Sequence, residues 1–316
     1  MDISVSATRD YRSALREWDH KSSVRSKSRR LITDLDGGQH YFSLLLAPCA
    51  SHDLVRRRGG DDVEHFLIDS LYSYLDFTAT LEQDIVNPVV LELARDSYGF
   101  GLGAEMRFDA YRIYCDEAYH ALTSVDVKHQ VQARTQLFAV PTPEPGFHWT
   151  LKTLKASLPE ELHRMVELCA AMVSETLISG TLTTLPKDPT VDDAIRASIA
   201  DHAADERTHH AFFAKVIETV WPQWDSATQR VLGPCFADLI VAFLAPDAGT
   251  VAQHLQRLGF SCDSREQIIY ESYTSDEVFD TVRHGAGATI RLMQRFGVLD
   301  EPRTHERFVE LGLVQD

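Results

Sequence analysis

Cysteine and long apolar runs are scarce in this sequence. The five cysteines lie far apart and no CxxC pair occurs, which excludes a disulfide framework and a cysteine zinc site. No apolar run approaches the roughly 18 residues of a membrane-spanning helix. The chain also lacks a basic stretch followed by an apolar stretch at its start. We therefore expect a cytoplasmic protein without a membrane partner.

Positive charge is also in short supply. There are 31 Lys and Arg against 47 Asp and Glu, giving a formal net charge of −16. This balance makes nucleic acid and anionic membranes poor candidate partners. Two local basic clusters are interpreted as solvated surface, with a docking patch for an acidic carrier protein as the alternative. They comprise Lys21, Arg25, Lys27, Arg29 and Arg30, and Arg56, Arg57 and Arg58.

A period-two strand pattern is missing, so the 316 residues are predicted to be all-α. Apolar residues at three- and four-residue steps indicate long helices at about 61–85, 104–132, 158–184 and 190–220. The first is expected to stop near Asn87-Pro88, with a short helix at 89–96. Further helices are expected near 225–244, 248–258, 264–271, 275–296 and 303–311. We predict one domain (1–316) with an N-terminal extension (1–60), a four-helix core (about 61–220) and C-terminal flanking helices (225–311).

Two of the long helices carry the same motif, Asp-Glu-x-x-His. One copy ends in Glu117 and His120, the other in Glu206 and His209. Glutamate and histidine three residues apart share one face of a helix. A single Glu-x-x-His is common by chance, but two copies on separate long helices are much stronger evidence for a shared site.

The other two long helices each place one carboxylate, Glu82 or Glu175, within an apolar pattern. Burying a lone carboxylate is unfavourable unless it is paired or binds a metal. The order Glu, Glu-x-x-His, Glu, Glu-x-x-His is that of ferritin-like bundles with two iron or two manganese ions. Carboxylates offset the charge of two metal ions, and imidazole favours iron or manganese over calcium or magnesium. We predict such a dinuclear site, with iron or manganese left open.

Neighbouring polar residues extend this prediction. Asp116 and Asp205 precede the two glutamates and would accept hydrogen bonds from ligand histidines, although ordinary surface acids remain an equal alternative. His202 lies one turn before Glu206, on the same face, and is a seventh candidate ligand. His210 points about 100° away from His209 and is not expected to bind metal.

The combined pattern of Glu82, Glu117-x-x-His120, Glu175 and His202-x-x-x-Glu206-x-x-His209 resembles the di-iron N-oxygenases related to p-aminobenzoate N-oxygenase. That family uses three histidines and four glutamates, and the resemblance covers about residues 60–300. It implies a metal centre of Glu82, Glu117, His120, Glu175, His202, Glu206 and His209 that uses O2 to oxidise a primary amine to a hydroxylamine, and further to a nitroso or nitro product. It also implies an external electron donor, such as a reductase.

The identity of the amine stays open. Arg291 is the one candidate for holding a substrate carboxylate, with a surface role as the alternative, so an aliphatic amine or a carrier-bound amino acid fits as well as p-aminobenzoate. A homodimer is also considered. Two other functions use the same ligands: hydroxylation or desaturation of a C–H bond, and iron binding without catalysis. A metal-free all-α module is the remaining alternative.

Overall fold

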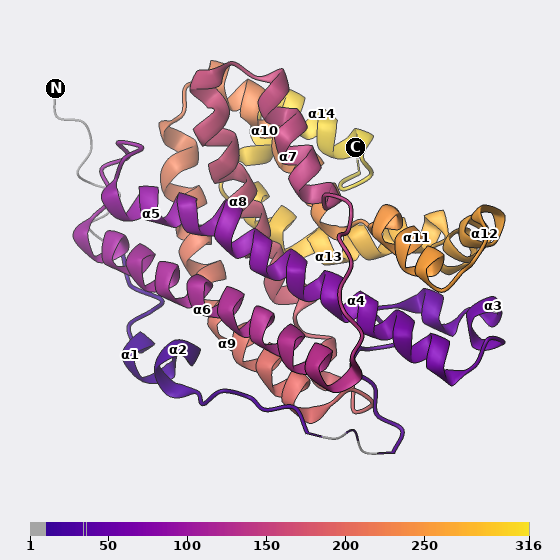
Figure 1. Cartoon of the computed structure of the whole chain (residues 1–316). Helices are drawn as coiled ribbons and strands as arrows, with labels where there is room; N and C mark the ends of the chain where they lie inside the picture. The colour runs from indigo at the N-terminus through magenta and orange to yellow at the C-terminus, as the bar shows by residue number, and fades with distance from the viewer. Residues whose placement is uncertain (1–10, 34, 36, 316) are drawn as a thin grey trace, which may run out of the picture.

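Figure 1 shows the computed structural model of the chain, which describes residues 11–33, 35 and 37–315 and gives the backbone alone for 179–181 and 275. Helices make up most of these residues. Their one β-type pairing is an isolated bridge between His40 and Val191. The all-α, ferritin-like class predicted from the sequence is confirmed.

The four long predicted helices are present and pack on one another. They are α4 (Gly60–Leu81), α6 (Ala104–Thr135), α8 (His163–Thr181) and α9 (Asp193–Val220). α6 packs against both α4 and α9, and α8 packs against α9 (Figure 1). Their apolar faces form one continuous core that includes Leu71, Ile113, Val173 and Phe213. The four helices therefore enclose a common interior.

The first core helix does not stop where the sequence predicted. A π-helical turn, Glu82–Val86, joins α4 directly to α5 (Asn87–Arg95). Its closing bond runs from the Asn87 N–H to the Glu82 carbonyl, one residue further back than in an α-helix. This wider turn lets the chain continue through Pro88, which has no N–H to donate. The expected stop at Asn87-Pro88 is therefore wrong, and the helix ends at a left-handed Asp96 instead.

The C-terminal helices follow the prediction to within a few residues. They are α10 (Ser226–Leu244), α11 (Ala248–Arg257), α12 (Cys262–Ser272), α13 (Ser275–Arg295) and α14 (Pro302–Glu310). Among the described helices longer than four residues, one was not predicted, α7 (Gly146–Ser157), which packs on α8 and α10. Short 3-10 turns connect several elements: Pro48–Ser51, Glu160–Leu162, Leu185–Lys187, Trp221–Gln223 and Val298–Asp300.

The described part of the N-terminal extension lies on the core. Its short helices are α1 (Trp18–Lys21), α2 (Ser23–Ser26) and α3 (Asp53–Arg56). α2 packs on both α6 and α9, whereas α3 packs beside the start of α4 (Figure 1). Between them, backbone hydrogen bonds tie His40 to Thr190 and Asp192, just before α9 begins. The extension thus covers the face formed by α6 and α9.

One stretch, Ser226–Arg257, is long and apolar enough to cross a membrane by length and composition. This is weak evidence, because core helices pass the same test. Here the stretch divides into α10 and α11, separated at Ala245–Asp247. Seven α10 residues, including Phe236 and Leu239, are buried in the protein. The expectation of no membrane partner stays a prediction.

Candidate metal centre

All seven predicted ligand residues meet inside the four-helix core. They form two overlapping groups, and within each group one potential ligand atom per residue lies within 4.8 Å of the others. Glu117 and Glu206 belong to both groups. The first group adds Glu82, His120 and His202; the second adds Glu175 and His209. Each group could hold one cation, with Glu117 and Glu206 available to both.

Burial makes these carboxylates unusual. The four glutamates have no exposed surface, and the three histidines are at most 4% exposed. Both carboxylate oxygens of Glu82 and of Glu175 find no hydrogen-bond partner among the described residues. Buried polar groups are normally hydrogen-bonded, so orphaned carboxylates that face imidazoles fit a metal ion. The residues present therefore suit a dinuclear metal centre.

The two Glu-x-x-His histidines present the same nitrogen to the cluster. His120 Nδ1 lies 2.7 Å from Glu117 and 3.4 Å from Glu206. His209 Nδ1 lies 2.8 Å from Glu117 and 3.4 Å from Glu206. His202 instead presents Nε2, 3.0 Å from Glu206 and 3.8 Å from Glu82. All three histidines thus aim a nitrogen at the carboxylates.

The opposite nitrogens are held by the two aspartates, in a crossed arrangement. Asp205 on α9 lies 3.2 Å from Nε2 of His120 on α6. Asp116 on α6 lies 3.1 Å from Nε2 of His209 on α9. An aspartate that accepts the Nε2–H leaves the Nδ1 lone pair free to bind a metal. These contacts fit the supporting role suggested by the sequence, which stays a prediction for both aspartates.

Three residues of the N-terminal extension, all missed by the sequence reasoning, hold these aspartates in turn. The Trp18 indole N–H and the Ser22 hydroxyl donate to Asp116, at 2.8 and 2.5 Å. The Ser23 backbone N–H donates to Asp205 at 3.1 Å. Both aspartates are buried, so each bond compensates for lost water. No motif marks these residues, because the bonded partners are far apart in sequence.

Electrostatics divide the glutamates into two classes. Burial, and then the neighbouring glutamates, raise the pKa of Glu82 and of Glu175 well above the ordinary range. Burial would also raise the pKa of Glu206, but the surrounding histidines hold it well below that range. Carboxylates packed this closely repel one another, so protons or cations must offset their charge. Two divalent ions could do so.

Comparison with known proteins agrees with this geometry. Residues 18–297 match the family model described as p-aminobenzoate N-oxygenase AurF. The chain belongs to the p-aminobenzoate N-oxygenase AurF family. It is also similar to the 4-aminobenzoate N-oxygenase of Streptomyces thioluteus, with 20% identity over 292 residues, which cover 90% of this chain and 85% of that protein. The resemblance predicted from the ligand pattern is confirmed, and with it the class of enzyme, an N-oxygenase.

The other predicted site residues of this AurF-family chain take different positions. Arg291 is exposed on α13, with its guanidinium lying back along the helix beside Gly287. Its assignment to a substrate carboxylate stays a prediction. One of the α13 residues that face the core is Thr289, which is buried and donates a hydrogen bond to the Thr176 carbonyl, next to Glu175. His210 belongs to neither ligand group, as expected.

Sequence reasoning also missed Tyr74 of α4. The Tyr74 hydroxyl is buried without a hydrogen-bond partner among the described residues. Burial, followed by the charge of Glu206, raises the pKa of this hydroxyl, so it stays protonated. Tyr74 lies two helical turns before Glu82. It is therefore a polar group available on the α4 side of the cluster.

Proposed function

We propose that this chain binds two iron ions and uses O2 to oxidise a primary amine to its hydroxylamine, and further to a nitroso or nitro product. Membership of the AurF family supports the reaction class. The observation that carries the metal assignment is the pair of overlapping ligand groups with orphaned, buried carboxylates. Nitrogen and carboxylate ligands suit iron, and manganese is the alternative metal.

The seven residues would divide between the two ions. Glu82, His120 and His202 would hold one ion, Glu175 and His209 the other, and Glu117 and Glu206 would serve both. The iron would supply the O2 chemistry and the electrons for oxygen transfer to nitrogen. The chain would exclude water, since every one of these residues is buried, and Asp116 and Asp205 would fix the imidazoles.

The substrate is proposed to be a small-molecule amine, either free or held by a carrier protein. We place it on the α4 side of the cluster, where the buried Tyr74 hydroxyl has unused hydrogen-bonding capacity. On the opposite side, Trp18 and Ser23 of the N-terminal extension bond the two aspartates that support the histidines. Tyr74 would accept or donate a hydrogen bond to the bound amine and so orient its nitrogen.

The test is to load the protein with Fe(II), add O2 and offer aromatic and aliphatic primary amines and an amino acid loaded on a carrier protein. Mass spectrometry with isotopically labelled O2 would follow oxygen incorporation. We expect label on nitrogen in at least one amine. Label on carbon alone would indicate a hydroxylase, and iron uptake without any product would indicate an iron-binding protein; either result would contradict the proposal.

A further inference from the structure

The N-terminal segment 11–30, here called the basic strap, differs in charge from the rest of the molecule. It contains seven Lys and Arg but two acids, Glu17 and Asp19, in a chain whose net charge is −16. The side chains of Lys21 and Arg29 are 69% and 63% exposed. Part of this charge pairs with acids: Lys21 with Glu17 of the strap, Arg29 with Asp126 of α6 and Arg30 with Asp201 of α9. The strap still forms a locally positive surface on an acidic protein.

This strap lies directly over the histidine side of the metal centre. The Trp18 indole is partly exposed, with the Arg25 guanidinium 5.8 Å from its ring. Its N–H donates to Asp116, which in turn holds His209. An unbroken chain of hydrogen bonds therefore runs from a surface indole to an imidazole of the cluster. An electron that followed this chain from the Trp18 indole to His209 would cross no through-space gap longer than a hydrogen bond.

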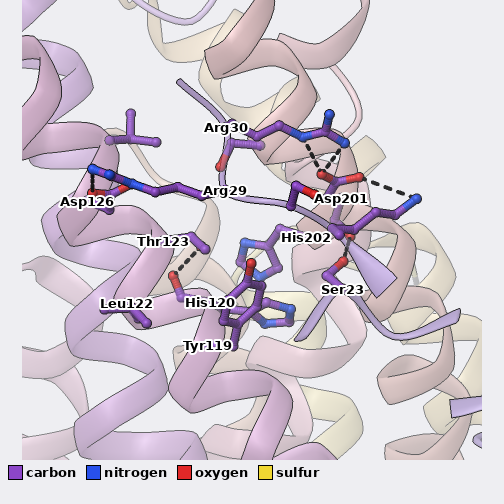
Figure 2. A pocket seen from close by; sticks show the side chains of 14 residues that line it. Ser23, Arg29, Arg30, Tyr119, His120, Leu122, Thr123, Asp126, Asp201 and His202 are labelled. Carbon is purple, nitrogen blue, oxygen red and sulfur yellow. Dashed lines mark hydrogen bonds and ion pairs between the residues drawn. The ribbon is translucent and has the colours of Figure 1, made fainter. Parts of the chain in front are cut away.

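A cavity of about 270 Å³ opens beside the same strap. Figure 2 shows it between α6 and α9, with His120 and His202 at its floor and the Arg29–Asp126 and Arg30–Asp201 pairs at its rim. The candidate ligands that line this cavity are both histidines. The strap side thus offers close approach to histidines and keeps the carboxylates behind them.

We propose that the basic strap docks an acidic one-electron donor protein of the ferredoxin class, and that electrons reach the metal centre through Trp18, Asp116 and His209. This inference rests on the proposed function, which consumes electrons that the chain shows no flavin or nicotinamide motif to supply. Each reduced iron–sulfur cluster gives up one electron and is oxidised. Two such donors reduce two Fe(III) to two Fe(II), and no bond or proton is exchanged.

The position of the strap favours an electron donor over a substrate carrier. An amine that entered from this side would find imidazole rings between itself and the carboxylates. An electron can pass through those rings to the metal centre. The second basic cluster, Arg56–Arg58, does not share this position. It begins at the last residue of α3, far along α4 from α1 and α2 (Figure 1).

The proposal is tested with the iron-loaded, oxidised protein and a reduced acidic [2Fe–2S] ferredoxin. Stopped-flow absorbance would follow ferredoxin oxidation, and calorimetry would measure its binding to the metal-free protein. We expect the double variant Lys21→Glu/Arg29→Glu to lower the second-order rate constant about tenfold or more at low salt, and to flatten its salt dependence. Reduction by dithionite, which does not need this docking surface, should keep its wild-type rate.

The matched control is Arg56→Glu/Arg57→Glu, which makes the same charge change on α3 and should stay within twofold of wild type. Trp18→Phe removes the indole N–H but keeps the Ser22 bond to Asp116. We expect it to bind ferredoxin with unchanged affinity and to retain its iron. Its reduction by ferredoxin should be at least about tenfold slower than that of wild type.

Three results would overturn the proposal. Equal reduction rates in the Lys21→Glu/Arg29→Glu variant and wild type would contradict docking on the strap. An unchanged reduction rate in Trp18→Phe would contradict the electron path through the indole. Strap-dependent binding of a loaded acidic carrier without any effect on reduction would assign the surface to the substrate instead. Failure of the proposed function looks different, because the protein would then bind no iron or oxidise no amine even with dithionite as reductant.

Discussion

The aspartate before each Glu-x-x-His motif serves the histidine of the other motif. Asp116 holds His209 and Asp205 holds His120, so α6 and α9 are linked through both imidazoles. Each aspartate is fixed in turn by Trp18, Ser22 or Ser23. The orientation of the metal-facing nitrogens therefore depends on residues that no metal ion would touch.

This dependence predicts the effect of replacing one aspartate. Asp205→Asn should lower iron affinity about 10- to 100-fold while the helices stay folded, because a neutral amide supports His120 less well than a carboxylate. Competition with a chelator, together with circular dichroism, measures both effects. Asp193→Asn, an exposed change near the start of α9, is the control. Equal iron affinity in the two variants would mean that Asp205 is an ordinary buried acid.

The two ligand groups make a separate prediction for His202, which belongs to one group alone. His202→Ala should weaken one metal position and spare the other, so that dialysed protein retains closer to one ion than two per chain. The O2-dependent absorption of the loaded protein should change as well. The neighbouring His210→Ala should do neither. If both variants keep two ions and the wild-type spectrum, His202 is only a histidine on the helix face.

At the scale of elements, the spacing of apolar residues predicted the helices correctly where a helix buries one continuous face. This holds for α4, α6, α8 and α9 and for the helices after residue 225. It failed at Asn87-Pro88, because a π turn changes the local hydrogen-bonding step and this has no periodic signal. It also missed α7, which buries little more than Phe147 and Leu151 and follows a proline-rich loop.

A histidine between two elements gives a pH prediction. His254 of α11 is buried, bonds Ser73 of α4 at 2.9 Å, and has a pKa lowered to about 4 by burial, then by Arg257 and His65. Because the unfolded chain takes up this proton near pH 6.5, the stabilisation is present above that pH and is lost as the pH falls towards 4. About 2 kcal/mol should disappear between pH 7 and pH 5.

Urea unfolding of metal-free protein at those two pH values measures this loss. His254→Gln should lose about 2 kcal/mol less than wild type between pH 7 and pH 5. The exposed His305→Gln should lose as much as wild type. An identical pH dependence in all three proteins would show that His254 is protonated equally in the folded and unfolded states.

At the scale of the whole molecule, the fold encloses four carboxylates in one interior. Burial and mutual repulsion raise the pKa of Glu82 and of Glu175. Protons and the histidines therefore offset the carboxylate charge in the metal-free protein. The sequence could predict these residues because they recur at helical spacing inside apolar faces. It could not predict Trp18, Ser22 and Ser23, because their partners lie 94 to 182 residues away.

Metal removal should therefore destabilise the whole protein. Metal ions would bind the folded cluster and not the unfolded chain, so saturation at 100 times the dissociation constant should add about 2.7 kcal/mol for each ion. Thermal unfolding with and without Fe(II) or Mn(II), under anaerobic conditions, measures this shift. Glu117→Ala, which removes a residue common to both groups, should abolish most of it. A metal-independent unfolding temperature in wild type would show that the cluster binds no metal.

The most direct test of the dinuclear centre is the metal content of the purified, reconstituted protein. Inductively coupled plasma mass spectrometry, with protein quantified by amino-acid analysis, would give the number of ions per chain. The two overlapping ligand groups predict two iron ions in wild type and a clear loss in Glu117→Ala. One ion per chain, or two ions that persist in Glu117→Ala, would contradict a centre built on shared carboxylates.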